Sequence, residues 1–126
     1  MTTPWSGRWR LVETDLWGED SIDLLEEACI VFDADRLGSL VVGALQADID
    51  YRAGERDGRP SVEFSWVGDD DGHPSSGRGW AQVQPDNTMR VKLYIHRGDE
   101  VTMIGAKPLS SPAAKGTGRG ARRRRR

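Results

Sequence analysis

The chain has 126 residues, of which 37% are hydrophobic and 30% charged, and its formal net charge is −2. This length suits one ordinary domain, and this composition excludes a wholly disordered chain and a membrane protein. The charge is segregated, however, because the segment from Gly105 to Arg126 holds eight basic residues and no acidic residue. Residues 1–104 carry the other ten basic residues and all twenty acidic residues, a net charge of −10. We therefore expect two units with different partners.

Hydrophobic periodicity predicts an all-β domain over residues 1–107. Apolar and polar residues alternate most clearly in residues 47–52, 61–67 and 89–96. Such alternation is typical of antiparallel strands with one face in water, because successive side chains point to opposite faces. Weaker patterns complete the set. The predicted strands are, in chain order, residues 7–14, 28–33, 39–45, 47–52, 61–67, 77–84, 89–96 and 100–107.

Three connections between these strands are less clear than the rest. Residues 21–27 begin with Ser21, which could cap a helix, but so short a helix is marginal, and an extended crossover is equally possible. The junction near Leu45 admits a tight turn, or a bulge at Gly43 within one bent strand. The acidic stretch 68–74 fails the calcium-loop spacing. We expect a solvated turn there, with a looser cation site as the alternative.

An antiparallel meander of about eight strands either closes into a barrel or splits into a sandwich. We expect a barrel, because closure removes the exposed strand edges. Eight strands enclose a space just wide enough for packed side chains or for one small ligand. After residue 107 the periodicity ends, and we expect residues 108–126 to be a disordered, Arg/Gly-rich basic tail.

The triplet Gly7-Arg8-Trp9, at the start of the first predicted strand, resembles the opening of the calycin barrels, the lipocalins and fatty-acid-binding proteins. In those families a basic residue from the last strand packs over the tryptophan and closes one end of the barrel. The resemblance implies this role for Lys107, which ends the last predicted strand, against Trp9. A cation over an indole face is a favourable contact.

A longer pattern resembles a family of small uncharacterised bacterial proteins that we expect to be calycin-like. The pattern covers roughly residues 5–107, and it implies no established activity and no catalytic residues. The basic tail lies outside it. The pattern consists of Gly7-x-Trp9, Trp17, Ile22-Asp23-Leu24, Val62-Glu63-Phe64-Ser65-Trp66, Ser76-Gly77-Arg78-Gly79-Trp80 and Ile95-His96-x-Gly98-Asp99.

Arg78 is the most site-like residue, because it lies between two glycines and beside Trp80. Glycines in a strand let a ligand or another backbone approach closely. The arginine could bind a carboxylate, or it could pair internally with Glu63 on the neighbouring strand, which we favour. The tryptophans either plug the core or form a cage around a planar or cationic group. The expected ligand-binding residues are Glu63, Trp66, Arg78 and Trp80.

The remaining reactive side chains have structural explanations. Cys29 lies in an apolar run after two glutamates, so we expect a small buried residue and not a reactive thiol. His96 ends a strand near Asp99, and we expect any pair between them to hold the hairpin rather than to act as a base. We therefore expect no catalytic residues, no metal site and no cofactor.

The basic tail is the part of the chain that is suited to nucleic acid. Lysine and arginine neutralise phosphates without reading sequence, so contact with nucleic acid would be weak and non-specific. A solubilising tail, or one that folds back on the acidic body, is the alternative. The tail residues expected to contact phosphate are Arg119, Arg122, Arg123, Arg124, Arg125 and Arg126.

These features favour a non-enzymatic binding module for an unknown small ligand, bound in the barrel interior or at its mouth. The alternative is an interaction protein that docks a protein by its acidic body or nucleic acid by its tail. An enzyme would need a carboxylate or His96 with a shifted pKa inside a cleft. The chain has no apolar leader and no apolar stretch of about 20 residues, so we expect a cytoplasmic protein without membrane insertion.

Overall fold

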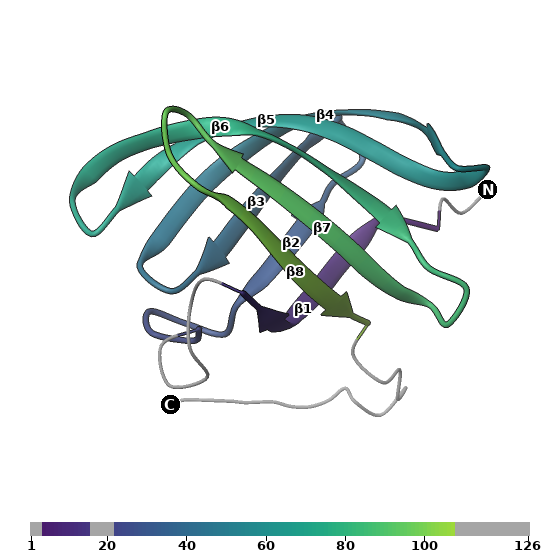
Figure 1. Ribbon diagram of the computed structural model, residues 1–126, viewed down its shortest axis with the longest axis horizontal. Coiled ribbons are helices and arrows are strands. Elements are labelled where there is room, and N and C mark those ends of the chain that lie inside the picture. The colour runs from purple at the N-terminus through teal and green to yellow at the C-terminus, as the bar shows by residue number, and fades with distance from the viewer. Residues whose placement is uncertain (1–3, 16–21, 108–126) are drawn as a thin grey trace.

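The computed structural model of the chain describes residues 4–15 and 22–107. Eight antiparallel strands follow one another in chain order around a closed barrel, and β8 pairs with β1 to complete the ring (Figure 1). This arrangement confirms the predicted all-β barrel and is compatible with a calycin-like fold. The predicted disorder of the basic tail falls outside the described residues. The strands are β1 (Gly7–Thr14), β2 (Cys29–Phe32), β3 (Leu37–Val42), β4 (Leu45–Arg56), β5 (Arg59–Asp70), β6 (His73–Val83), β7 (Thr88–Ile95) and β8 (Glu100–Ala106).

Strands β4, β5 and β6 are longer than predicted, and residues 68–74 are mostly strand. Strand β5 continues through Asp70, β6 begins at His73, and only Asp71 and Gly72 form the turn. Both turn residues have positive φ, 55° and 86°. Positive φ at both positions gives a two-residue hairpin turn whose twist matches that of its strands. The prediction of a solvated turn over the whole of residues 68–74 is therefore wrong in extent.

The junction near Leu45 is a tight turn between two separate strands. Val42 pairs with Leu45 across the turn, and Gly43 has a φ of 58°, which glycine adopts at little cost. The backbone N–H of Gly43 also donates to the carbonyl of Ile22 at 2.8 Å. This bond attaches the described end of the β1–β2 connection to the β3–β4 turn, and Ile22 itself is buried in the core.

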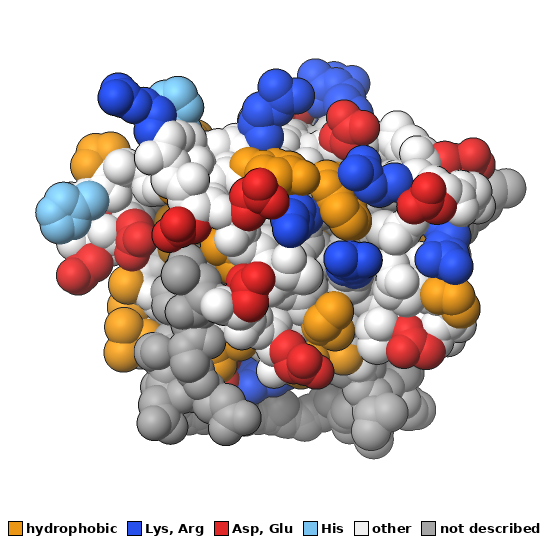
Figure 2. Space-filling view, viewed as in Figure 1, with side chains coloured by type: hydrophobic (Ala, Val, Ile, Leu, Met, Phe, Trp, Pro, Cys, Tyr) orange, Lys and Arg blue, Asp and Glu red, His pale blue; other side chains and the backbone are white. Residues whose placement is uncertain are grey.

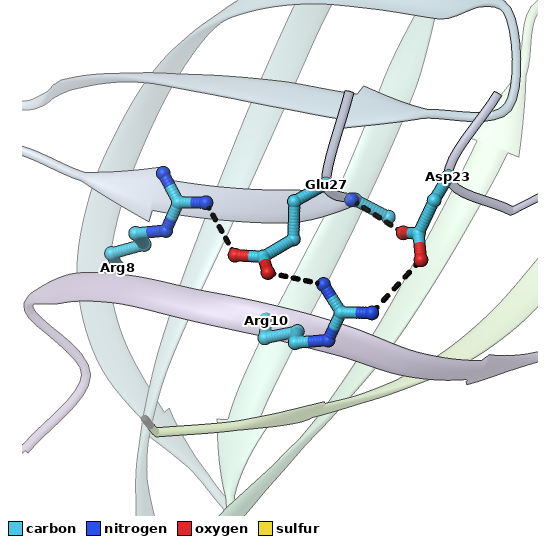
Figure 3. A network of polar contacts seen from close by, with 5 residues as sticks. Arg8, Arg10, Asp23 and Glu27 are labelled. Atoms are coloured by element: carbon cyan, nitrogen blue, oxygen red, sulfur yellow. Dashed lines mark hydrogen bonds and ion pairs between the residues drawn. The ribbon is translucent and has the colours of Figure 1, made fainter. Parts of the chain in front are cut away.

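Residues 22–27 form turns and bends and not a helix, and Ser21, the expected helix cap, lies outside the described residues. Arg10 of β1 lies 2.8 Å from the Asp23 carboxylate and 2.7 Å from that of Glu27 (Figure 3). Arg8 lies 2.8 Å from the same Glu27. Asp23 also accepts a hydrogen bond from the backbone N–H of Ala28 at 2.7 Å. Single exposed ion pairs contribute little, but these shared partners hold the segment against β1.

Every strand contributes apolar side chains to the barrel interior, and these side chains fill it. An eight-stranded barrel provides about the room that packed side chains need. A bound small ligand would therefore have to displace core residues. The largest fully buried side chains include Trp9, Phe32, Leu11, Ile30, Leu40 and Leu45.

Two glycines of β6 make room for aromatic rings of the core. Gly77 lies opposite Trp66 in the β5–β6 register, and Gly79 lies opposite Phe64. A Cβ on Gly79 would lie 2.6 Å from the Phe64 ring and 2.5 Å from the carbonyl oxygen of Lys92. The glycines that flank Arg78 are thus explained by core packing, and no ligand has to be invoked for them.

The end of the barrel where β1 begins is closed by aromatic side chains and one lysine. Lys107 Nζ lies 4.7 Å from the centroid of the Trp9 ring, so the contact that the calycin resemblance implies is present. The same nitrogen donates to the carbonyl of Ser6 at 2.6 Å. Trp5 covers the closed end, with its ring edge-on to Tyr51 at a centroid distance of 5.1 Å. Partial burial lowers the pKa of Lys107, because desolvation penalises its charged form.

Candidate binding site on the outer wall

The four residues expected to bind a ligand lie on two different faces of the barrel wall. Trp66 points inward and is 3% exposed. Glu63 lies on the same strand, three positions before Trp66, so its side chain points to the opposite face of the sheet and is exposed. Glu63 lies opposite Trp80, and Arg78 lies opposite Ser65, so these polar residues share the outer face. The expectation of a site in the barrel interior or its mouth is therefore not met: Arg78 and Glu63 do not face the interior.

Trp80 is the centre of the outer-wall group. The guanidinium of Arg56, at the end of β4, lies 4.1 Å from the centroid of the Trp80 ring. The indole Nε1 of Trp80 donates to the hydroxyl of Tyr94 on β7 at 3.3 Å. A shallow depression of about 390 Å³ lies here, and its lining includes Arg56, Glu63, Arg78, Trp80 and Tyr94. We call these five residues the Trp80 site. A second depression, on the β4 side, shares Glu63 and Arg78 with it.

Among the described residues that line the Trp80 site, Arg78 is a cation without a partner. On one side Arg52 pairs with Asp50 at 2.5 Å, and on the other Lys92 pairs with Glu100 at 3.3 Å. Among the described residues, Arg78 makes no ion pair and no side-chain hydrogen bond. An exposed guanidinium in this state is available to a carboxylate or phosphate, which it can bind through two parallel hydrogen bonds.

The favoured internal pair between Arg78 and Glu63 is not formed in the described residues. The register explains this result, because the residue directly opposite Arg78 on β5 is Ser65. Glu63 instead faces Trp80 on one side and Arg52 on the other, so it is diagonal to Arg78. Diagonal neighbours are farther apart than direct ones. Both charges consequently remain exposed at the wall.

Two members of the Trp80 site were missed by sequence reasoning. Tyr94 alternates outward within β7, but only the β6–β7 register shows that it lies opposite Arg78. Arg56 lies four residues beyond the predicted end of its strand, because β4 continues to the Asp57-Gly58 turn. The Asp57-Gly58 pair could have indicated the longer strand, since the two strands of a hairpin with a two-residue turn extend as far as the turn.

The other candidate residues contribute no chemistry to this site. Trp66 Nε1 is buried without a hydrogen-bond partner, against the position where a Gly77 side chain would begin. The described contacts include none between the side chains of His96 and Asp99. Cys29 is a buried free thiol, and burial raises its pKa, which disfavours the reactive thiolate. Residues 4–15 and 22–107 contain no group of three or more metal-ligating side chains placed to share a metal ion.

Figure 2 shows that acidic and basic side chains are interspersed around small apolar patches on one face of the barrel. Within the described part of the chain, no helix has the length and apolar character that a membrane crossing needs. Comparison of the chain with protein-family models, curated proteins and solved structures found no match in any of the three.

Proposed function

We propose that the chain is a non-enzymatic binding module whose ligand binds at the Trp80 site, outside the barrel. The observation that carries this proposal is the unpartnered guanidinium of Arg78 in a depression that also contains the Trp80 indole and the Tyr94 phenol. The filled interior supports an outer site, because a ligand there displaces no core residue. The contacts available favour a planar group that carries a carboxylate or phosphate. A calycin-like ancestry and a cytoplasmic location are part of this proposal.

The proposal is tested with two small probes that differ in charge. Indole-3-acetate has a planar ring and a carboxylate, whereas indole-3-acetamide has the same ring without the charge. The indole N–H resonances of the protein are followed by NMR during titration with each probe. We expect the acetate to shift the Trp80 resonance and to bind about tenfold more tightly than the amide, because charge-assisted hydrogen bonds contribute about 1.5–3 kcal/mol.

The matched variants are Arg78→Gln and Arg90→Gln. Both remove one exposed arginine, but Arg90 does not line the Trp80 site. We expect the preference for the acetate to disappear only in the Arg78 variant. Equal binding of the two probes, or a shift of the buried Trp66 resonance in place of Trp80, would contradict the proposal.

The basic tail supports a second candidate function, contact with nucleic acid. It rests on the eight basic and no acidic residues between Gly105 and Arg126. The test compares the full chain with a full-length variant in which Arg119 and Arg122 to Arg126 are glutamine, using a twelve-nucleotide oligothymidine at two salt concentrations. Each phosphate contact adds about −0.7 to the slope of log affinity against log salt for single strands. Equal affinity and equal slope for the two proteins would eliminate this function.

A further inference from the structure

The outer face of β3, β4 and β5 is a second surface without a partner among the described residues. Its two most exposed apolar side chains are Val67, which is 63% exposed, and Leu37, which is 56% exposed. Large apolar side chains exposed together on one face of a sheet indicate a contact surface more often than isolated ones do. A depression of about 300 Å³ runs across this face beside Val67. We call this surface the β3–β5 face. The side chains that line it from outside are Ser39, Val41, Gln46, Asp48, Val67 and Asp69.

The β3–β5 face carries negative charge that nothing in the described residues neutralises. Asp48 and Asp69 line the depression, and no basic residue does. Neither carboxylate belongs to an ion pair within the described chain. Asp71, in the turn that follows β5, adds a further exposed carboxylate at the same end. A surface that combines exposed valine side chains with carboxylates that make no ion pair is complementary to a segment that is partly apolar and strongly basic.

The basic tail of the same chain has this composition. Residues 108–114 are Pro-Leu-Ser-Ser-Pro-Ala-Ala, and residues 115–126 follow with seven basic and no acidic residues. We propose that residues 108–126 dock on the β3–β5 face of their own barrel. The apolar part of the tail would contact Val67 and Val41, and its arginines would lie near Asp48 and Asp69.

The tail has the length to reach this face. It begins after Lys107, which is held at the closed end by Trp9 and the Ser6 carbonyl. Strand β4, which carries Asp48 in the middle of this face, is four strands from β8 in either direction around the ring. Four strand spacings amount to about 19 Å, whereas the twelve residues from 108 to 119 span up to about 40 Å when extended. The tether also keeps the tail at an effective concentration in the millimolar range, which favours a weak intramolecular contact.

The experiment uses the full chain with a nitroxide label on a cysteine introduced by Gly120→Cys. The native Cys29 is buried, so the label attaches selectively. We expect the label to broaden the amide resonances of residues 39–41, 46–48 and 67–69 at about 20 mM salt, and to do so far less at about 500 mM. This change shortens the Debye length from about 20 Å to about 4 Å, so the exposed charges of the tail and of the β3–β5 face attract each other only at very short distances.

Two double variants of the labelled chain distinguish docking of the tail on the β3–β5 face from general electrostatic attraction between the basic tail and the acidic barrel. Asp48→Asn with Asp69→Asn removes the carboxylates of the face, and Asp35→Asn with Glu55→Gln removes two exposed carboxylates elsewhere, for the same change in net charge. We expect only the first pair to abolish the broadening. Broadening spread evenly over the barrel, or reduced equally by both pairs, would overturn the proposal. A mixing experiment gives a further test, in which a nitroxide-labelled chain is added to an isotope-labelled chain without a nitroxide. Broadening of the isotope-labelled chain would also overturn the proposal, because the docked tail would then come from a second copy.

Discussion

Gly79 lies directly opposite Phe64 in the β5–β6 register, and the Phe64 ring occupies the space that a side chain on Gly79 would need. A Cβ at this position would also approach the carbonyl oxygen of Lys92 to 2.5 Å, and that backbone atom cannot move without disturbing the β6–β7 pairing. The choice of residue at position 79 of β6 therefore affects how Phe64 packs in the barrel interior.

We predict that Gly79→Ala destabilises the protein by about 1–3 kcal/mol, the usual effect of overpacking a core. The measurement is the free energy of unfolding in urea. Gly54→Ala is the matched control, since a Cβ on Gly54 would meet nothing within 4 Å. We expect the control to change the free energy by less than about 0.5 kcal/mol. Equal effects of the two substitutions would show that core space is not the reason for glycine at position 79.

We predict that Lys107→Met lowers the free energy of unfolding by about 1–2 kcal/mol. The substitution removes a cation from the Trp9 ring and a hydrogen bond from the Ser6 carbonyl, while an apolar stem remains. Lys92→Met is the comparison, because Lys92 belongs to a partly exposed pair with Glu100. Such pairs contribute about 0–1 kcal/mol. A smaller effect at Lys107 than at Lys92 would contradict the role of Lys107 in closing the barrel.

We predict that Asp23→Ala destabilises the protein by about 1–2 kcal/mol, because it removes both an ion pair with Arg10 and a hydrogen bond to the Ala28 N–H. Glu26→Ala removes a nearby exposed carboxylate that makes no ion pair within the described residues. We expect it to have little effect in the same urea titration. If the two variants unfold at the same urea concentration, the network of Figure 3 does not hold the segment.

We predict that the stability of the protein falls more steeply above pH 9 than the stability of a Cys29→Ala variant. Burial raises the pKa of the Cys29 thiol above its ordinary value of 9.0, and the nearby Arg8 only partly opposes this shift. The folded state therefore keeps the proton while the unfolded state loses it. The stabilisation is complete below about pH 9 and is lost as the pH rises through the folded-state pKa, with a slope of up to about 1.4 kcal/mol per pH unit. The free energies of unfolding are compared between pH 8 and 10.5, and parallel profiles would contradict the prediction.

The barrel could be predicted from the sequence because its strands are recognisable from short local patterns of apolar and polar residues. Alternation in residues 47–52, 61–67 and 89–96 identifies wet-faced strands, and their number and short connections favour closure. The extra length of β5 and β6 was missed because Asp69 and Asp70 have low strand propensity. The turn at Asp71 and Gly72, which has the same form as the one at Asp57 and Gly58, outweighs that propensity.

The candidate site could be predicted only in part, because it depends on register. Alternation alone places Arg78 and Trp80 on one face, but it does not say which residue of β5 lies opposite each. The turn at Asp71 and Gly72 sets Ser65 against Arg78, and this prevents the expected internal pair with Glu63. Arg56 reaches the Trp80 ring from β4, two strands away, which no local pattern encodes.

The pairing of β1 with β8 has a consequence for how the chain is made. Among the described strands, every other pairing joins neighbours in sequence, whereas this one joins the first strand to the last. During synthesis β1 and β7 therefore present open edges until residue 106 has left the ribosome. Open strand edges are sites of aggregation. Truncation of the chain before β8 should thus leave the edges of β1 and β7 open and promote aggregation.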